Sequence, residues 1–295
     1  MYKLIAIAKT TAHEILSEPL SLLVTLSALA LTVLSPVLHY HQFGEATRMA
    51  RDAMFSAMLI GGVVIAVFST IKTYRRELED GTADMALSHS ISRGSFFISK
   101  LIGIFVALSC AMLSILGAGM LMVFGSALGE AISFRTGNLT TVFGPCVAGG
   151  AAIILLPIIL SAILNRFARF RFVITCQLTA LALALLAIAV SLFAYPRLFD
   201  YLPAALLLVS LLFVFATIAA AFSMHMKSNL AASLSFIMIA IFLPAIGNYY
   251  LSEALSHDGS ISWLYVLFAF LAIAPVYAIF MLIGVQDRKY HIPRH

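Results

Sequence analysis

The chain has 295 residues, of which 62% are hydrophobic and 11% are charged, and its mean hydropathy is +1.04. Soluble domains are only about 45–50% apolar, so the composition excludes an ordinary soluble enzyme and predicts an all-α polytopic membrane protein. The net charge of +5 could suit a nucleic-acid partner, but the basic residues lie mostly at the ends of apolar runs, as membrane topology requires. We therefore expect no nucleic acid among the partners. No segment outside the apolar runs reaches the roughly 50 residues of a soluble domain, which predicts one membrane domain over 1–295.

Residues 1–18 predict an amphipathic helix that lies in the membrane interface. On a helical wheel one face is apolar, with Leu4, Ile5, Ala8, Ala12, Ile15 and Leu16. The opposite face is polar, with Lys3, Lys9, Thr10, His13 and Glu14. Such a helix would lie flat with its apolar side toward the hydrocarbon, and the alternative is an unstructured tail.

Eight apolar runs are long enough to cross about 30 Å of hydrocarbon. They cover 20–41, 52–73, 101–128, 141–164, 172–195, 204–226, 229–250 and 262–284. The weakest separation is between the sixth and seventh runs, where only a short polar connector around Lys227 intervenes, so six to eight spans remain possible. Each backbone polar group in lipid must be paired within the chain, which leaves helices as the spanning elements.

The distribution of Lys and Arg predicts that both termini are cytoplasmic. With the N-terminus inside, fourteen of the 18 basic residues fall on the cytoplasmic side. The remaining four, Arg48, Arg51, Arg135 and Arg197, fall outside. This asymmetry follows the positive-inside rule and supports an even number of spans.

No motif in the sequence indicates chemistry performed by this chain itself. A Walker A pattern, a Ser/His/Asp set and a His-Glu-x-x-His zinc motif are all missing, and no metal site is expected. Cys110, Cys146 and Cys176 lie in apolar runs without metal-ligand spacing, as small buried side chains do.

The segment 74–100 is the densest polar stretch between two spans and must lie in water. Acidic residues precede Gly81-Thr82, a sequence suited to ending one helix and capping another, and we expect a short helix over 83–87. A second restart at Ser90 to Arg93 leads into the next span. The pattern is typical of two short surface elements packed under the helix bundle, on which another protein can dock.

This segment resembles the cytoplasmic loop of type-2 (export-type) ABC-transporter permeases. The family pattern E-x-E-x-G-T, then L-L-S-x-P-[IV]-S-R, then G-K is matched at Glu77, Glu79, Gly81, Thr82, Leu87, Ser88, Ile91, Ser92, Arg93 and Lys100. The chain departs from the pattern at Ala86, Ser90 and Ser99, and in its eight spans where six are usual.

The resemblance implies a coupling helix that docks on a separate ATPase subunit. The docking residues would be Glu77, Glu79, Asp80, Gly81, Thr82, Leu87, Ser88, Ser92 and Arg93. A second contact would fall at Asn165, Arg166 and Arg169. The chain would be a transport subunit of the cell (inner) membrane and not an enzyme, paired with a second copy or paralogue. It would bind no cofactor itself, and two ATPase subunits would hold ATP and Mg²⁺.

No motif in the sequence identifies the cargo, although spans with few polar groups suit an amphipathic or lipid-like molecule. Two other function classes stay open. An ATP-independent secondary transporter would need repeats and broken helices, and Gly61-Gly62 and Gly149-Gly150 are only weak candidates for breaks. An integral-membrane enzyme would need a cluster of acids or histidines at one depth, which the sequence does not provide.

Overall fold

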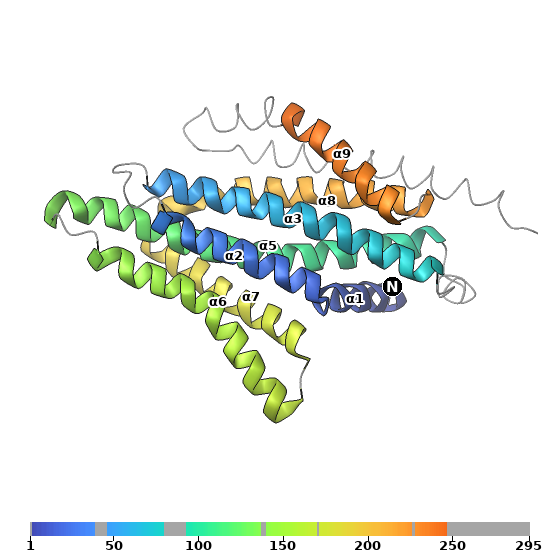
Figure 1. The fold of residues 1–295 in the computed structure, drawn as a ribbon, viewed down its shortest axis with the longest axis horizontal. Helices are drawn as coiled ribbons and strands as arrows, with labels where there is room; N and C mark the ends of the chain where they lie inside the picture. Colours follow the sequence, from blue (N-terminus) through green and yellow to red (C-terminus); the bar gives the residue numbers. More distant parts are fainter. Residues whose placement is uncertain are drawn as a thin grey trace, which may run out of the picture. The chain divides into compact units, whose positions relative to one another are not determined.

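A computed structural model describes residues 2–38, 46–79, 93–136, 140–169, 171–225 and 228–246. Every regular element in these ranges is a helix, so the predicted all-α class is confirmed for the described chain (Figure 1). The elements are α1 (Tyr2–Leu16), α2 (Pro19–Leu38), α3 (Ala46–Glu79), α5 (Arg93–Thr136), α6 (Thr140–Ala168), α7 (Phe172–Ala194), η1 (Pro196–Asp200), α8 (Tyr201–His225) and α9 (Ser228–Ile246).

Five helical stretches in the described residues are long and apolar enough to cross a membrane, and the pair α1 and α2 would make a sixth if counted as one bent span. The polytopic membrane character is thereby supported. The predicted span 229–250 is represented by α9, and 262–284 lies outside the described residues. The count of eight spans stays a prediction.

The helices α3 and α5 run well beyond the spans predicted for them. They contain 34 and 44 residues, which at 1.5 Å per residue gives lengths of about 51 and 66 Å. Hydropathy marks only the part that fits about 30 Å of hydrocarbon, so the helices continue past the predicted span ends at 73 and 101. The helical ends that flank the segment 80–92 therefore extend past the apolar runs.

The predicted N-terminal helix is present as α1, and it bends by 62° into α2 across Ser17 and Glu18. Part of its apolar face, including Ala12 and Ile15, is buried in the protein, whereas Ile5 is 66% exposed. The apolar face of α1 that was predicted to contact lipid therefore packs partly against the protein and is partly exposed. Its position at the membrane interface stays a prediction.

The chain divides into two compact units, each assembled from separated stretches of sequence. Unit 1 contains residues 1–15, 63–108 and 206–295, and unit 2 contains 16–62 and 109–205. The long helices α3 and α5 contribute one part to each unit. The prediction of a single domain is not tested by this division.

Aromatic contacts join the helices of unit 1. Phe105 of α5 packs edge-on against Phe213 of α8 with 5.0 Å between ring centroids. Phe68 of α3 lies 5.7 Å from Phe236 of α9. These contacts join two pairs of helices whose members are distant in sequence, α5 with α8 and α3 with α9.

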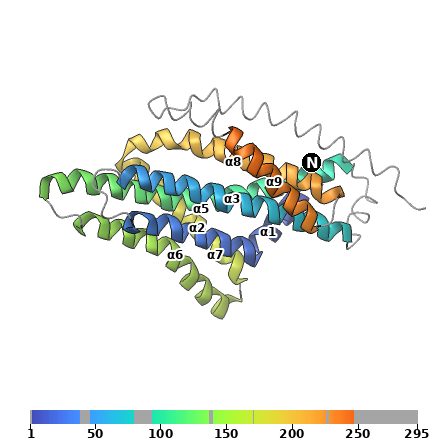
Figure 2. The same cartoon turned by 45° about the horizontal axis from the view of Figure 1, so that its top comes forward.

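Unit 2 packs α2, α6 and α7 together, and η1 against α7. Close approach of α5 and α7 depends on small residues, because a Cβ added at Gly117 would collide with Ala184. Figures 1 and 2 show α6 bent along its length. It contains Pro157, which cannot donate a backbone hydrogen bond, and we attribute the bend to this residue.

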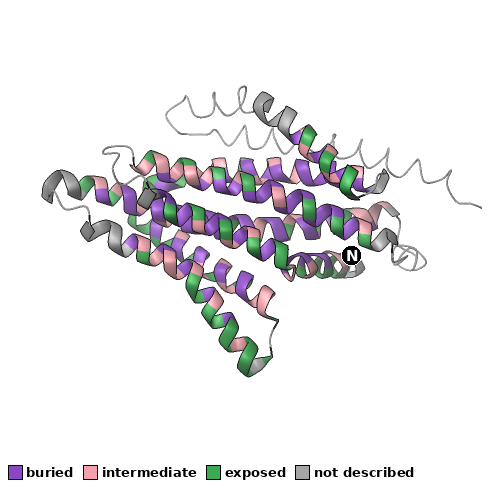
Figure 3. Ribbon diagram, in the orientation of Figure 1, coloured by how far each residue is buried: buried purple, intermediate pink, exposed green. Residues whose placement is uncertain are grey.

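Burial differs strongly between the helices (Figure 3). The most apolar windows of α3 and α5 are 67% buried, but those of α6 and α7 are only 22% and 28% buried. In a membrane such exposed apolar faces would contact lipid or another membrane helix. Several buried hydroxyl groups bond within their own helices, as when Thr32 Oγ1 donates to the Ala28 carbonyl at 2.8 Å.

Candidate functional site

The candidate site is the root of the segment 80–92, formed by the end of α3, the beginning of α5 and the neighbouring α1. Glu77 and Glu79 lie in the last turn of α3, and Arg93 is the first residue of α5. Their side chains are outside the described residues, as are all atoms of the other predicted docking residues, Asp80, Gly81, Thr82, Leu87, Ser88 and Ser92. The short helix predicted over 83–87 also lies outside the described residues.

A buried lysine joins α5 to α3 at this root. Lys100 is 2% exposed, and its Nζ lies 5.3 Å from the ring centroid of Phe96 and 5.7 Å from that of Tyr74. An ammonium within about 6 Å of aromatic faces is stabilised by their quadrupoles, which offsets part of the cost of burying the charge. The lysine thus acts as a packed part of the helix junction.

Tyr74 makes two further contacts across the same junction. Its ring stacks on Phe97 with 5.7 Å between centroids, and its hydroxyl donates a hydrogen bond to the Phe97 carbonyl at 3.3 Å. Tyr74 lies six residues before the segment 80–92, and Phe97 five residues after it. Both ends of the segment are therefore attached to one aromatic cluster, Tyr74, Phe96, Phe97 and Lys100, which we call the root cluster.

An ion pair ties α1 to the same end of α3. The Arg76 guanidinium donates from Nη1 to Glu14 Oε1 at 2.9 Å. Both side chains are substantially exposed, 62% for Arg76 and 41% for Glu14, so the pair contributes little to stability by itself. It does fix which face of α3 meets α1.

The helices α1 and α5 approach each other closely at Gly103. A Cβ built on Gly103 would lie 2.5 Å from the Ala8 carbonyl oxygen and 2.7 Å from Thr11 Cβ. Real Cβ atoms do not approach so closely, so any larger residue would push the two helices apart. Gly103 is required where α5 crosses α1.

The second predicted contact, Asn165, Arg166 and Arg169, lies at the junction of α6 and α7 in unit 2. Asn165 and Arg166 are exposed on the last turn of α6, which continues to Ala168, and their role as a second contact stays a prediction. Arg166 in this last turn interacts favourably with the negative end of the helix dipole. Arg169 follows with a φ of 55°, the left-handed conformation that ends many helices.

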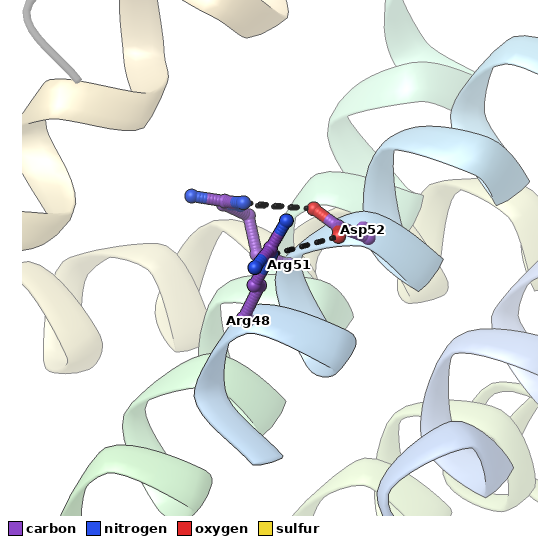
Figure 4. A network of polar contacts seen from close by, with 3 residues as sticks. All are labelled: Arg48, Arg51 and Asp52. Atoms are coloured by element: carbon purple, nitrogen blue, oxygen red, sulfur yellow. Dashed lines mark hydrogen bonds and ion pairs between the residues drawn. The ribbon is translucent and has the colours of Figure 1, made fainter. Parts of the chain in front are cut away.

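The other end of α3 carries a separate polar cluster in unit 2 (Figure 4). Asp52 pairs with Arg51 at 3.0 Å and with Arg48 at 4.0 Å. Glu130 accepts from the Thr47 amide at 3.0 Å and from its hydroxyl at 2.8 Å, and so caps the N-terminus of α3. This cluster stabilises a helix end and contains no arrangement that predicts catalysis.

Sequence reasoning counted Lys100 among the basic residues of the polar segment and missed its burial. The available signal was the pair Phe96-Phe97 one helical turn before it, which places aromatic rings beside the lysine stem. Lys100 is the only charged residue that is buried in the described part of the chain. That rarity distinguishes it from the basic residues that mark span ends.

The root cluster can hold the segment 80–92 mechanically, but it offers no reacting group. Among the described residues no three His, Cys, Asp or Glu side chains come together to hold a metal ion. No family model, no curated protein and no solved structure matches this chain, so its function is inferred from its own residues and contacts.

Proposed function

We propose that the chain is the membrane-spanning permease subunit of an ATP-driven ABC transporter. Separate ATPase subunits dock on the segment 74–100 at the cytoplasmic side, with Glu77, Glu79 and Arg93 among the contacts. The proposed cargo is amphipathic or lipid-like and is exported. Two permease chains, or one with a paralogue, form the pathway.

The observation that carries this proposal is the way in which the segment 80–92 is rooted. Three helices, α1, α3 and α5, meet beside it through the Arg76–Glu14 pair, the root cluster and the Gly103 crossing. A segment that receives movement from a partner must be attached to elements that move as one body. An ordinary solvated connector has no need of a buried lysine between aromatic rings.

The scarcity of buried charge supports the class of cargo. Apart from Lys100 at the root, the buried polar side chains of the described residues are serines, threonines and one glutamine. An ion pathway would need charged or densely polar lining to replace water around the ion. A pathway without such groups suits a cargo whose surface is largely apolar.

Affinity purification tests the existence of the ATPase partner. The tagged chain is purified from its native membrane in mild detergent, and the co-purifying proteins are identified by mass spectrometry. We expect a stoichiometric ATPase with a Walker A motif, which is lost when residues 77–93 are scrambled. A chain that purifies alone and moves substrate without ATP would contradict the proposal and support the secondary transporter.

Charge reversal tests the docking residues. In the reconstituted complex, Glu77→Lys with Glu79→Lys should lower both assembly and stimulated ATPase activity by at least about tenfold, because two repelling charges at an interface cost several kcal/mol. The matched control is Asp200→Lys, a reversal of an exposed acid in η1. Normal assembly of the Glu77 and Glu79 variant would remove these residues from the contact.

A further inference from the structure

A small cavity with both apolar and polar walls lies inside unit 2, lined by residues of α2, α5 and α7 and by Leu16. Its polar lining comes from Thr25 of α2, Cys110 and Ser114 of α5, and Gln177 of α7, and leucines and an alanine complete the wall. Gln177 is only 6% exposed, and it is the only Gln, Asn or acidic residue that is buried in the described chain. Its amide Nε2 donates to Ser21 Oγ at 3.0 Å.

The hydrogen-bond inventory leaves this cavity rich in acceptors. Gln177 Oε1 is buried and has no hydrogen-bond partner. Thr25 Oγ1 already donates to the Ser21 carbonyl at 2.8 Å, and Ser114 Oγ to the Cys110 carbonyl at 2.9 Å. Each of these hydroxyls has therefore used its single hydrogen and can only accept, whereas the second hydrogen of the Gln177 amide and the Cys110 thiol can still donate. The buried Oε1 of Gln177 is satisfied only by a group that donates a hydrogen bond.

Charge and size restrict the ligand further. No charged side chain lines the cavity, so an ammonium or metal cation would lose its hydration without compensation. The enclosed space holds about one water-sized group, which excludes a ring or a lipid headgroup. The chemistry that fits is a single neutral hydroxyl, from water or from the end of an apolar molecule.

The wall of the cavity reaches the surface of unit 2 beside Leu178. This residue lines the cavity and is 49% exposed. Leu185 and Leu186 lie two turns further along the same face of α7 and are also exposed, at 47% and 61%. An unbranched chain attached to the hydroxyl could lie along this row of leucines.

We propose that unit 2 binds a long-chain alcohol, with the hydroxyl donating to Gln177 Oε1 and the hydrocarbon chain lying on the exposed face of α7. The site goes beyond the proposed transport function, because binding requires neither an ATPase nor turnover. Long-chain monohydroxy lipids are the chemical class that the site would take.

Two probes of equal chain length test the requirement for a donor. The chain is placed in phosphatidylcholine nanodiscs, whose lipid offers no hydrogen-bond donor, and binding of radiolabelled 1-dodecanol is measured in excess of empty discs. Unlabelled 1-dodecanol should displace the label, and dodecyl methyl ether, which can only accept, should do so about three- to tenfold more weakly. Equal displacement by both would show that binding does not require a donor, and a lack of saturable binding would leave water as the only occupant; either result would overturn the proposal.

Variants of the chain assign the binding to Gln177. Gln177→Met keeps the length of the side chain and should weaken dodecanol about three- to tenfold while leaving the ether unchanged. Ser114→Ala removes a second acceptor with less disturbance of packing and should weaken dodecanol in the same direction. Thr179→Val is the matched control on α7, since Thr179 is not among the residues that line the cavity and its hydroxyl bonds within its own helix. Unchanged dodecanol affinity in both Gln177→Met and Ser114→Ala would overturn the assignment, and a thermal melt of each variant reports whether it is folded.

Discussion

The Nζ of Lys100 lies 5.7 Å from the centre of the Tyr74 ring, and both residues are 2% exposed. The lysine belongs to α5 and the tyrosine to α3, so their contact bridges the segment 80–92 from inside the protein. The attraction between an ammonium and an aromatic ring is stronger when the pair is buried than when it is exposed, because water no longer competes for the charge. The contact is therefore open to a quantitative test.

A double-mutant cycle on Lys100 and Tyr74 should reveal their coupling. Lys100→Met and Tyr74→Leu each remove the charge–ring contact while retaining an apolar side chain, and we expect a coupling free energy of about 1 kcal/mol. The measurement is the free energy of unfolding of the four proteins in detergent. Tyr74→Phe serves as the control, since it keeps the ring and loses only the hydrogen bond to Phe97. Additive effects of the two changes would show that the ring does not stabilise the ammonium.

The ion pair between Arg76 and Glu14 should be weak and sensitive to salt. Because both side chains are largely exposed, Glu14→Lys should lower stability by only about 0.5 kcal/mol, and adding Arg76→Glu should restore most of the loss. At about 1 M salt, where the Debye length falls to about 3 Å, the difference should vanish. Thermal melts at two salt concentrations measure this, and a loss that persists at high salt would point to packing instead of charge.

The same substitution at two glycines of α5 should have opposite effects. Gly103→Ala places a methyl group against the Ala8 carbonyl, which cannot move cheaply, and should destabilise the protein by about 1–3 kcal/mol. Gly94→Ala meets nothing within 4 Å and should add up to about 0.5 kcal/mol through its better helix propensity.

Release of α1 is the expected physical result of Gly103→Ala. Tryptic cleavage after Lys9 should become faster in this variant than in the unchanged chain and in Gly94→Ala. Cleavage at the same rate in all three proteins would mean that α1 does not depend on the crossing at Gly103.

Arg169 offers a separate test of the junction between α6 and α7. Its φ of 55° strains any residue with a Cβ, so Arg169→Gly should be more stable than Arg169→Ala by about 1 kcal/mol. Both variants remove the charge, and the difference between their unfolding free energies isolates the backbone. If Arg169 also belongs to the proposed second contact, both should bind the ATPase subunit more weakly to the same extent.

Hydropathy alone located most helices closely. The run predicted over 172–195 is α7, Phe172–Ala194, and the described parts of α8 and α9 lie on either side of the connector near Lys227, ending at His225 and beginning at Ser228. These features follow from local composition, since a spanning segment must be apolar throughout and its connector polar.

The packing around the segment 80–92 could not be predicted in the same way. Lys100 resembled any basic residue at the end of a span until its neighbours in space were known. Gly103 is one of 17 glycines, and nothing local distinguishes the one that α1 crosses. The unpartnered Oε1 of Gln177 depends on which side chains from α2 and α5 surround it. Each of these facts involves partners that are far apart in sequence.

The interleaved composition of the two units has a consequence for synthesis in the cell. All residues of unit 2 lie before Leu206, whereas unit 1 also needs residues from 206 onward. A ribosome that has inserted the chain as far as Ala205, in the first turns of α8, has therefore delivered everything unit 2 requires, while the partners of Phe68 and Phe105 on α9 and α8 are still to come. During that interval the halves of α3 and α5 that belong to unit 1 expose apolar surface to lipid, to the insertion machinery or to chaperones.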